Sequence, residues 1–224
     1  MSGSMRIQDI PLRPDRRLVD ELGKMVTPHL SDSMERLYGG GSAVRPMHLN
    51  ARLAGPAFTV RTAPGDNLLV HKALDMAQPG DVIVVDAGGH TGNAIIGELM
   101  ATHARQRGIA GLVIWGAIRD SAELAASDFP VYAAGVTHRG PYRNGPGEIN
   151  VPVVIGAMPV MPGDIVVGDA DGIVAVAPAD AERVLASAQA ILVKETAAMR
   201  LFLAGSADRS WVDKTLRDKG YVLP

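Results

Sequence analysis

The spacing of apolar positions changes several times along this chain, and each change marks an expected strand or helix. Continuous or alternating apolar runs, which are typical of strands, occupy residues 53–62, 81–89, 111–120, 130–135, 149–156 and 164–177. Helical spacing predicts helices at residues 16–27, 29–38, 68–77, 97–107, 121–126, 178–203 and 209–219. Strands that alternate with helices favour an α/β fold with a central mixed sheet and flanking helices.

Two segments sharpen this expectation. The run GLVIWGAI at residues 111–118 is apolar throughout, which is typical of a strand covered on both faces. Asp169-Ala170-Asp171-Gly172 separates two β-branched runs and predicts a hairpin turn. We expect a single domain over residues 1–224, with a core at about residues 28–178 and a helical C-terminal extension at residues 178–224.

The composition limits the classes of function. Of the 224 residues, 47% are hydrophobic and 21% are charged, so we expect a buried core rather than disorder. The net charge is −2 and Lys and Arg form no run, which argues against a nucleic-acid partner. No apolar stretch approaches the roughly 20 residues of a membrane span, and the N-terminal segment does not resemble a signal peptide. We expect a cytoplasmic protein without a nucleic-acid or membrane partner.

The chain contains no cysteine, which excludes disulfides, thiolate nucleophiles and cysteine-based zinc sites. Any metal would therefore be held by carboxylates, imidazoles, carbonyl groups or water. This set of ligands suits Mg2+ or Mn2+.

Residues 97–100 predict an anion site. The strand that ends near Asp86 is followed by Gly88-Gly89 and by an expected loop at residues 90–96, and the expected helix then starts at Gly97-Glu98-Leu99-Met100. The first N–H groups of a helix have no partner within the helix, and together with the helix dipole they favour an anion such as a ligand carboxylate. A glycine-rich connection without any ligand would give the same sequence pattern.

Arg119 and Asp120 follow strand 111–118 directly. In open α/β sheets ligands bind beyond the carboxyl ends of strands, so this pair is placed to face a pocket. A solvated turn or a local salt bridge is the simpler alternative. The 20 residues between Glu98 and Arg119 span one helix and one strand, which returns the chain to the same edge of the sheet, and Glu123 follows Asp120 by three positions. These four charged groups can thus converge around a hard cation and an anionic substrate.

The combined pattern resembles a known family. Gly97-Glu98-Leu99, followed after 20 residues by Arg119-Asp120-x-x-Glu123, is similar to the class II 4-hydroxy-4-methyl-2-oxoglutarate/4-carboxy-4-hydroxy-2-oxoadipate aldolases. The same fold family includes the regulators of ribonuclease E activity. The likeness runs from about Asp32 to Lys194-Glu195 and takes in Gly65-Asp66-Asn67, Val85-Asp86 and the hairpin at residues 168–172.

The resemblance implies a swivelling β/β/α domain that forms a homotrimer or a hexamer of two trimers. It implies that Asp120 binds Mg2+ or Mn2+. It also implies a small 2-oxo acid as substrate, with its pyruvate part held by Gly97, Glu98, Leu99, Met100 and Arg119. Support for the metal would come from Glu123 through water, or from Asp32 and Glu195 contributed by a neighbouring subunit.

An aldol cleavage has to stabilise the enolate left when the C–C bond breaks, through a lysine Schiff base or a metal ion. No lysine lies between Asp86 and Glu123, which favours the metal. The expected activity is cleavage of a 4-hydroxy-2-oxo acid to pyruvate, with oxaloacetate decarboxylation through the same enolate. Arg119 would stabilise the enolate and Glu98 would transfer the proton. A protein-binding regulator of a ribonuclease, and a structural oligomer with an interfacial salt bridge, stay open as alternatives.

Other polar groups are weaker candidates. The histidines show no spacing typical of metal ligands, although His90 lies in the glycine-rich segment and can face the pocket. Two arginines and a tyrosine cluster in the Gly/Pro-rich segment HRGPYRNGPGE at residues 138–148. We expect this segment to form a subunit contact or to pack as a loop.

Overall fold

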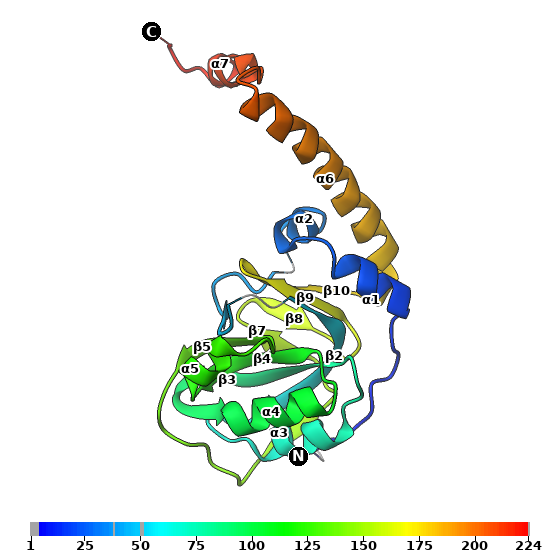
Figure 1. Ribbon diagram of the computed structural model, residues 1–224, viewed down its shortest axis with the longest axis vertical. Coiled ribbons are helices and arrows are strands. Elements are labelled where there is room, and N and C mark those ends of the chain that lie inside the picture. The colour runs from blue at the N-terminus through cyan, green and yellow to red at the C-terminus, as the bar shows by residue number, and fades with distance from the viewer. Residues whose placement is uncertain (1–4, 38, 50–51, 224) are drawn as a thin grey trace. The chain divides into compact units, whose positions relative to one another are not determined.

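The computed structural model describes residues 5–37, 39–49 and 52–223. Its helices are α1 (Arg16–Leu22), α2 (Thr27–Asp32), α3 (Leu68–Met76), α4 (Glu98–Gln106), α5 (Ser121–Ala126), α6 (Ala181–Leu203) and α7 (Ser210–Asp218), with a 3-10 turn, η1 (Pro178–Asp180), before α6. Its strands are β1 (Arg45–Pro46), β2 (Leu53–Thr62), β3 (Val82–Ile96), β4 (Gly111–Ile118), β5 (Val131–Val136), β6 (Gly147–Ile149), β7 (Val153–Ile155), β8 (Met158–Val160), β9 (Ile165–Asp169) and β10 (Gly172–Val176). The predicted α/β class is confirmed (Figure 1).

An eight-stranded mixed sheet forms the centre, in the order β1-β5-β4-β3-β2-β9-β10, with β6 also paired to β2. Strands β2 to β5 are parallel to one another, whereas β1, β6, β9 and β10 pair antiparallel. Helices α3, α4 and α5 connect the parallel strands, because parallel neighbours need a crossover connection. The carboxyl ends of these strands therefore lie at one edge of the sheet.

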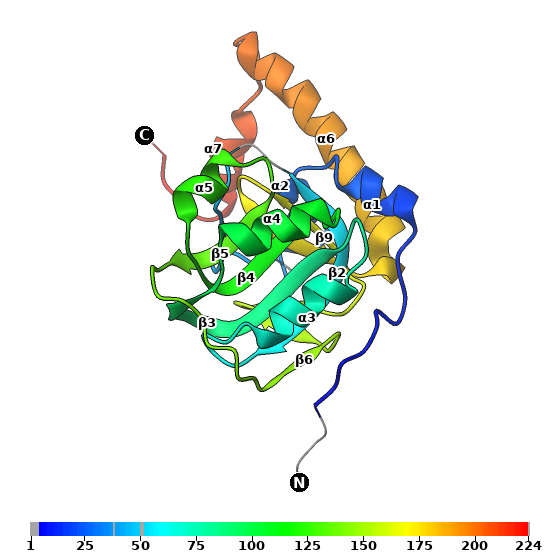
Figure 2. The same ribbon diagram turned by 60° about the horizontal axis from the view of Figure 1, so that its bottom comes forward.

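Both faces of the parallel strands are covered. Along β3, Ile83 and Val85 pack in the cluster that contains residues of α3, α4 and α5, whereas Val82 and Val84 pack with the β7–β8 hairpin and β10. Figure 2 shows α3 and α4 lying along the same face of the sheet. This double coverage explains why the first four residues of β3 and all of β4 are apolar or glycine, as the run at residues 111–118 predicted.

The β9–β10 hairpin carries a third apolar cluster. Ile165 and Val174 pack there with Leu22 of α1 and Val184 of α6. The two strands pair from Gly172 opposite Asp169 to Val176 opposite Ile165, so the turn predicted at residues 169–172 is confirmed. The hairpin thereby joins the sheet to the N-terminal helices and to the start of α6.

The largest departure from the sequence prediction concerns residues 90–96, which we predicted as a loop and which form the second part of β3. The strand keeps its pairing with β4 through several register shifts, so that Ile96 still lies opposite Ile118. Gly89 has a φ angle of 68°, and a Cβ atom at this position would lie 2.7 Å from the Trp115 ring. The glycines that we interpreted as the end of a strand instead form an irregular, bulged part of it.

Two N-terminal helices are shorter than predicted. The helix predicted at residues 16–27 ends early, and α2 begins at Thr27, because the N–H and the hydroxyl of Thr27 both donate to the Asp169 carboxylate. The helix predicted at residues 29–38 ends at Asp32, and residue 38 lies outside the described residues. A side-chain acceptor from a distant hairpin sets this helix start, and local spacing does not reveal it.

The strand predicted at residues 149–156 divides into β6 and β7. Asn150 has a φ angle of 53°, and the two halves pair with different strands, β6 with β2 and β7 with β8. Pro152 lies between the two halves and removes one N–H donor from the segment.

The chain forms two compact units, Met1–Ala188 and Gln189–Pro224. The first contains the sheet, α1 to α5 and the first residues of α6, and the second contains the rest of α6 and α7. Across residues 5–37, 39–49 and 52–223, no helix is both long enough and apolar enough to span a lipid bilayer.

Candidate active site

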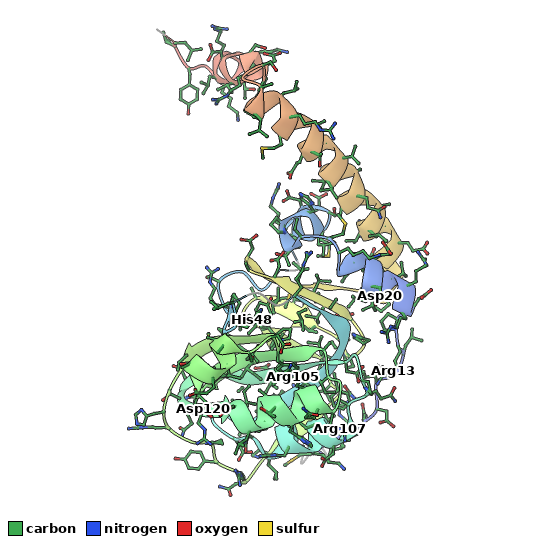
Figure 3. All side chains as sticks on the ribbon, in the orientation of Figure 1. Arg13, Asp20, His48, Arg105, Arg107 and Asp120 are labelled. Carbon is green, nitrogen blue, oxygen red and sulfur yellow. The ribbon has the colours of Figure 1, made fainter. Side chains whose placement is uncertain are left out.

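Three of the predicted site residues, Gly97, Arg119 and Asp120, meet at the carboxyl ends of β3 and β4. The Arg119 N–H donates to the Ile96 carbonyl oxygen at 3.0 Å, so the segments that follow the two strands lie side by side. Gly97 follows β3 and precedes α4, whereas Arg119 and Asp120 follow β4 and precede α5. Figure 3 shows Asp120 at this edge of the sheet, beside α4. The structure thus places two strand ends and two helix starts around one point.

Asp120 has a left-handed backbone, with φ 56° and ψ 44°, immediately before α5. Its carboxylate Oδ2 accepts the Glu98 N–H at 3.0 Å and lies 3.7 Å from Nε of Arg119. Its Oδ1 makes no hydrogen bond to the described residues, and the side chain is 38% exposed. A left-handed conformation at a residue other than glycine costs on the order of 1–2 kcal/mol. One carboxylate oxygen thus bonds to the start of α4, and the other has no partner among the described residues.

Gly97 allows this close approach. Its backbone is extended, with φ −148°, so any residue can adopt the conformation. A Cβ atom at Gly97 would lie 2.4 Å from Asp120 Oδ2 and 2.9 Å from Arg119 Cγ. Space, rather than backbone freedom, requires glycine at this position.

The first turn of α4 provides two further donors. The N-cap residue of this nine-residue helix, Gly97, has no side chain to accept a bond, and the Asp120 carboxylate accepts the N–H of Glu98 instead. The next two N–H groups, from Leu99 and Met100, have no acceptor within the helix. With the helix dipole and the Arg119 guanidinium beside them, these amides favour an anion of carboxylate size.

A cavity of about 290 Å³ lies in front of these donors, and we call it the α4 pocket. Its lining comes from the end of β3, the start of α4, Arg119, two residues of the α3 region (Asn67 and His71), and Gly140, Pro141 and Arg143. The last three belong to residues 137–146, which we call the pocket loop. Arg119, Arg143 and His71 thus face this cavity. Arg143 and His71 lie outside residues 86–123, the segment singled out from the sequence.

Two buried polar atoms in the α3 wall have no hydrogen-bond partner among the described residues, namely Asn67 Oδ1 and His71 Nε2. The Asn67 amide nitrogen, in contrast, donates to the Ile95 carbonyl oxygen at 3.0 Å. Burial lowers the pKa of His71, and the charge of Arg143 lowers it further. The lowered pKa favours the neutral form of the His71 imidazole at pH 7. Unpaired buried polar atoms are costly, and beside a pocket they indicate a place for a ligand or for ordered water.

The other predicted residues are placed differently. The Glu98 side chain is exposed and is not part of the pocket lining, so only its N–H takes part in the contacts described above. Glu123 is exposed in the first turn of α5. Asp32 pairs with Arg36 at 2.8 Å on α2, and Glu195 lies in the second compact unit. The roles expected for these four carboxylates in proton transfer or metal support stay predictions.

Sequence reasoning missed three polar side chains of the pocket lining: Asn67, His71 and Arg143. We predicted a subunit contact or simple loop packing for the segment that carries Arg143, whereas it forms part of the pocket wall. The signal was present in its two arginines and a tyrosine between glycines and prolines, which is an unusual composition for a passive loop. His90, in contrast, does not line the pocket, and its ring lies 3.5 Å from Asn93 Oδ1.

A metal would find few protein ligands at this site. Within the described part of the chain, no three His, Asp or Glu side chains gather in an arrangement that could hold an ion. Asp120 provides a single carboxylate. Mg2+ commonly retains several waters and takes one or two carboxylates together with groups of the substrate, so the donor set fits this kind of ion.

The chain matches known proteins over most of its length. A family model described as RraA-like, Aldolase/RraA, matches residues 27–175. A protein of Halalkalibacterium halodurans named "Putative 4-hydroxy-4-methyl-2-oxoglutarate aldolase" is 43% identical over 163 residues, which are 73% of this chain and 78% of that protein.

Solved structures show the same fold. A protein from Pseudomonas syringae pv. tomato str. DC3000 aligns with a TM-score of 0.78 and 27% identity, over 88% of this chain and 96% of that one. The RNA-processing inhibitor RraA from Thermus thermophilis aligns with a TM-score of 0.63 and 32% identity, over 68% and 93% of the two chains. Streptomyces coelicolor RraAS2, a member of the RNase ES inhibitor RraA family, aligns with a TM-score of 0.74 and 29% identity, over 83% and 96%.

Proposed function

The chain belongs to the RraA-like family described as Aldolase/RraA, and from that premise we propose that it is a divalent-metal-dependent aldolase. It would cleave a 4-hydroxy-2-oxo acid to pyruvate and would also decarboxylate oxaloacetate. The observation that carries the proposal is the α4 pocket, which is lined by Arg119 and by the start of α4. The Asp120 carboxylate is not part of this lining, but it lies directly beside it, bonded to the Glu98 N–H and 3.7 Å from Nε of Arg119. Positive charge, helix amides and a carboxylate at one point suit a 2-oxo acid together with a cation.

Mg2+ or Mn2+ would be held by Asp120 Oδ1, by water and by the substrate. When bound, the cation would supply the positive charge that stabilises the enolate formed on cleavage. Exposed carboxylates such as Glu123 would support it through water. Asp32 and Glu195 would do so from a neighbouring subunit of a homotrimer or hexamer.

The residues of the chain bind and orient the substrate. The Leu99 and Met100 amides would bind its 1-carboxylate, and Arg119 would lie beside the 2-oxo oxygen. Cleavage breaks the C3–C4 bond, leaves its electron pair on the pyruvate part and removes the proton of the 4-hydroxyl group. Because Arg119 meets charge that develops at the 2-oxo oxygen, it would act mainly in the transition state. Glu98 stays the candidate for the proton, acting through water from its exposed position.

The remainder of the substrate would lie against the second arginine of the pocket. The relative from Halalkalibacterium halodurans is named after an acid that carries a second carboxylate. Arg143 and the neutral His71 line the same cavity, so they would bind a carboxylate at the far end of such a substrate. This arrangement favours a substrate with a second carboxylate over one whose far end is uncharged.

The test is pyruvate release from oxaloacetate and from a panel of 4-hydroxy-2-oxo acids with one or two carboxylates. We expect activity with Mg2+ or Mn2+, loss of activity in EDTA, and recovery when metal is restored. Full activity in EDTA after extensive dialysis would rule out metal dependence. No pyruvate from any substrate, with folded metal-loaded protein, would rule out the aldolase.

The sharing of each site between subunits has its own test. Asp120→Ala and Glu195→Ala proteins are each expected to be nearly inactive, and after subunit exchange random assembly of a cyclic trimer should rebuild about a quarter of the sites. A mixture that stays inactive despite verified exchange would contradict a shared site, as would full activity of Glu195→Ala alone.

A second candidate function is a protein-binding regulator of ribonuclease activity. It is favoured by the 32% identity to the Thermus structure named as an RNA-processing inhibitor. Inhibition of ribonuclease E by the purified chain, retained in Asp120→Asn, would support this function. Catalysis that depends on Asp120 without any such inhibition would support the aldolase.

A further inference from the structure

The pocket loop is held by the buried carboxylate of Asp66, which is not part of the pocket lining. Asp66 is only 2% exposed, and its Oδ2 accepts the N–H groups of Asn144 at 2.5 Å and Gly145 at 3.0 Å. Its Oδ1 accepts the Leu68 N–H at 2.9 Å. All of its hydrogen-bond partners among the described residues are backbone N–H groups. A buried carboxylate without a cation is tolerated when several such donors surround it.

These bonds join two walls of the α4 pocket. Leu68 is the first residue of α3, the helix that carries His71, whereas Asn144 and Gly145 belong to the loop that carries Arg143. One side chain therefore fixes both the start of α3 and the end of the loop segment that faces the pocket. A change at Asp66 affects both walls together.

The backbone completes the attachment of the loop. Tyr142 donates to the Gly65 carbonyl oxygen at 2.8 Å and accepts the Asn67 N–H at 3.0 Å. At the other end of the loop, the Asn93 side-chain amide donates to the Gly140 carbonyl oxygen at 2.8 Å. These bonds attach the loop to the end of β3 and to the segment before α3, although most of its residues are exposed. We expect a loop with these attachments to move less than a surface loop without them.

The loop also contacts the catalytic arginine proposed above. A Cβ atom at Gly140 would lie 3.4 Å from Nη1 of Arg119, so the Gly140 backbone lies against the guanidinium group. The position of the loop therefore limits where the Arg119 side chain can lie.

We propose that Asp66 is a positioning residue for the proposed reaction: its carboxylate holds the pocket loop so that Gly140 supports Arg119 and Arg143 faces the substrate. This inference rests on the proposed function. Asp66 itself lies outside the pocket lining, and it acts through the two arginines.

The decisive variant is Asp66→Asn, which keeps the size of the side chain. An asparagine offers one oxygen, and its NH2 group would face an N–H donor that the carboxylate now accepts. We expect amide hydrogen exchange across residues 137–146 to become about 10-fold faster or more, and kcat/KM to fall about 10- to 100-fold, the range that follows from losing hydrogen bonds to a charged group. Asp66→Glu, with the charge kept but displaced, should be intermediate.

Asp164→Asn is the matched control. Asp164 is a second buried carboxylate, 8% exposed, which accepts the Met161 N–H at 2.8 Å and does not line the α4 pocket. It should leave exchange at residues 137–146 and kcat/KM unchanged. If Asp66→Asn does not fold, Asn93→Ala removes the other side-chain anchor of the loop and should raise exchange and lower kcat/KM in the same direction.

A role through Arg143 is separated from a general loss of structure by a double-mutant cycle. In the Arg143→Ala background, Asp66→Asn should lower kcat/KM by a smaller factor than in the wild type, because part of its effect is already lost. Independent, multiplicative effects would overturn the proposal, as would unchanged exchange at residues 137–146. If the wild type cleaves no 2-oxo acid, the proposed function fails, and the exchange measurement alone decides whether Asp66 holds the loop.

Discussion

The aspartates at the two ends of the parallel strands differ in burial and in pairing. At the amino end, Asp81 directly precedes β3, its side chain is 1% exposed, and it pairs with Arg13 and accepts the Gln78 N–H at 2.8 Å. At the carboxyl end, Asp120 follows β4, is 38% exposed, and holds a left-handed backbone. Figure 3 shows Arg13 and Asp120 on opposite sides of the sheet.

From this difference we infer that the amino end of the strands serves stability and the carboxyl end serves function. Every oxygen of the Asp81 carboxylate has a partner, so this charge stabilises the fold and offers nothing to a ligand. Around Asp120, strain, an oxygen without a described partner and the unpaired polar atoms of Asn67 and His71 remain. Strain and unpaired groups reduce stability, and they persist at sites where a ligand satisfies them. Substitutions at the two ends should therefore change different properties.

The largest effect is expected from Asp120→Asn. The amide can still accept the Glu98 N–H and should keep the fold, but it removes the negative charge proposed to bind the metal. We expect pyruvate release to fall at least on the order of 10³-fold, the upper range for loss of one group that stabilises a developing oxyanion. Thermal unfolding should stay within a few degrees of the wild type. A large loss of stability with activity retained per folded molecule would show that Asp120 serves the fold and not the reaction.

Arg119→Lys should follow in size. Lysine keeps the positive charge but loses the planar fork that can contact two oxygens at once. We expect kcat to fall on the order of 10²-fold or more, because the contact is made with charge that develops in the transition state. Steady-state kinetics with oxaloacetate provide the measurement. A change confined to KM would mean that Arg119 binds substrate and transition state equally.

Gly97→Ala tests how closely the carboxyl end is packed. The added Cβ would overlap Asp120 Oδ2 at 2.4 Å, so the carboxylate and the start of α4 have to separate. A displacement of about 1 Å at a reacting group can cost on the order of 10²-fold in rate, and we expect a fall of at least 10-fold in kcat/KM. Gly39→Ala, where the nearest atom to a new Cβ is Ser31 Oγ at 3.8 Å, is the control and should be silent. Equal activities of the two variants would contradict the close packing.

Arg13→Ala tests the amino end of the strands. It leaves the buried Asp81 carboxylate without its cation, which typically costs 3–5 kcal/mol, and because Arg13 is 34% exposed we expect about 2–3 kcal/mol. Urea unfolding should show this loss, whereas kcat of the folded protein should be unchanged. Arg17→Ala breaks an exposed pair with Glu182 and should cost less than about 1 kcal/mol. If Arg13→Ala lost catalytic activity while fully folded, the assignment of the amino end to stability alone would be wrong.

The amino-acid sequence predicts those strands and turns that are marked by a local pattern of apolar positions or by turn residues. Strand β2 keeps its predicted bounds at residues 53–62, and the hairpin at residues 169–172 is present, because alternation and turn residues are local signals. The second half of β3 could not be predicted, since its glycines indicate a turn unless the pairing with β4 is known. Long-range pairing overrides local preference here.

The site divides in the same way. Arg119, Asp120 and the start of α4 could be predicted because crossover topology brings consecutive strand ends to one edge. The composition around Arg143 marks its segment as unusual, but the place of Arg143 at the pocket could not be predicted, because it depends on the bonds from Asp66 to Asn144 and Gly145, 78 and 79 positions away in the sequence. Nothing in the local sequence around Arg143 indicates these contacts.

The smallest expected effect concerns His71 and pH. Burial and Arg143 lower its pKa below the ordinary value of 6.5, while Asp75 opposes them and His103 adds to them. As the pH falls below about 6.5, the unfolded chain binds the proton first, so the stability present above that pH is lost through the lowered pKa of the folded state. His71→Gln lacks this loss, so its urea midpoint should rise relative to the wild type between pH 7.5 and pH 5.5. His138→Gln, at an exposed position outside the pocket lining, controls for the removal of an imidazole as such. A constant difference between His71→Gln and the wild type across this range would show that the imidazole is not held neutral beside the pocket.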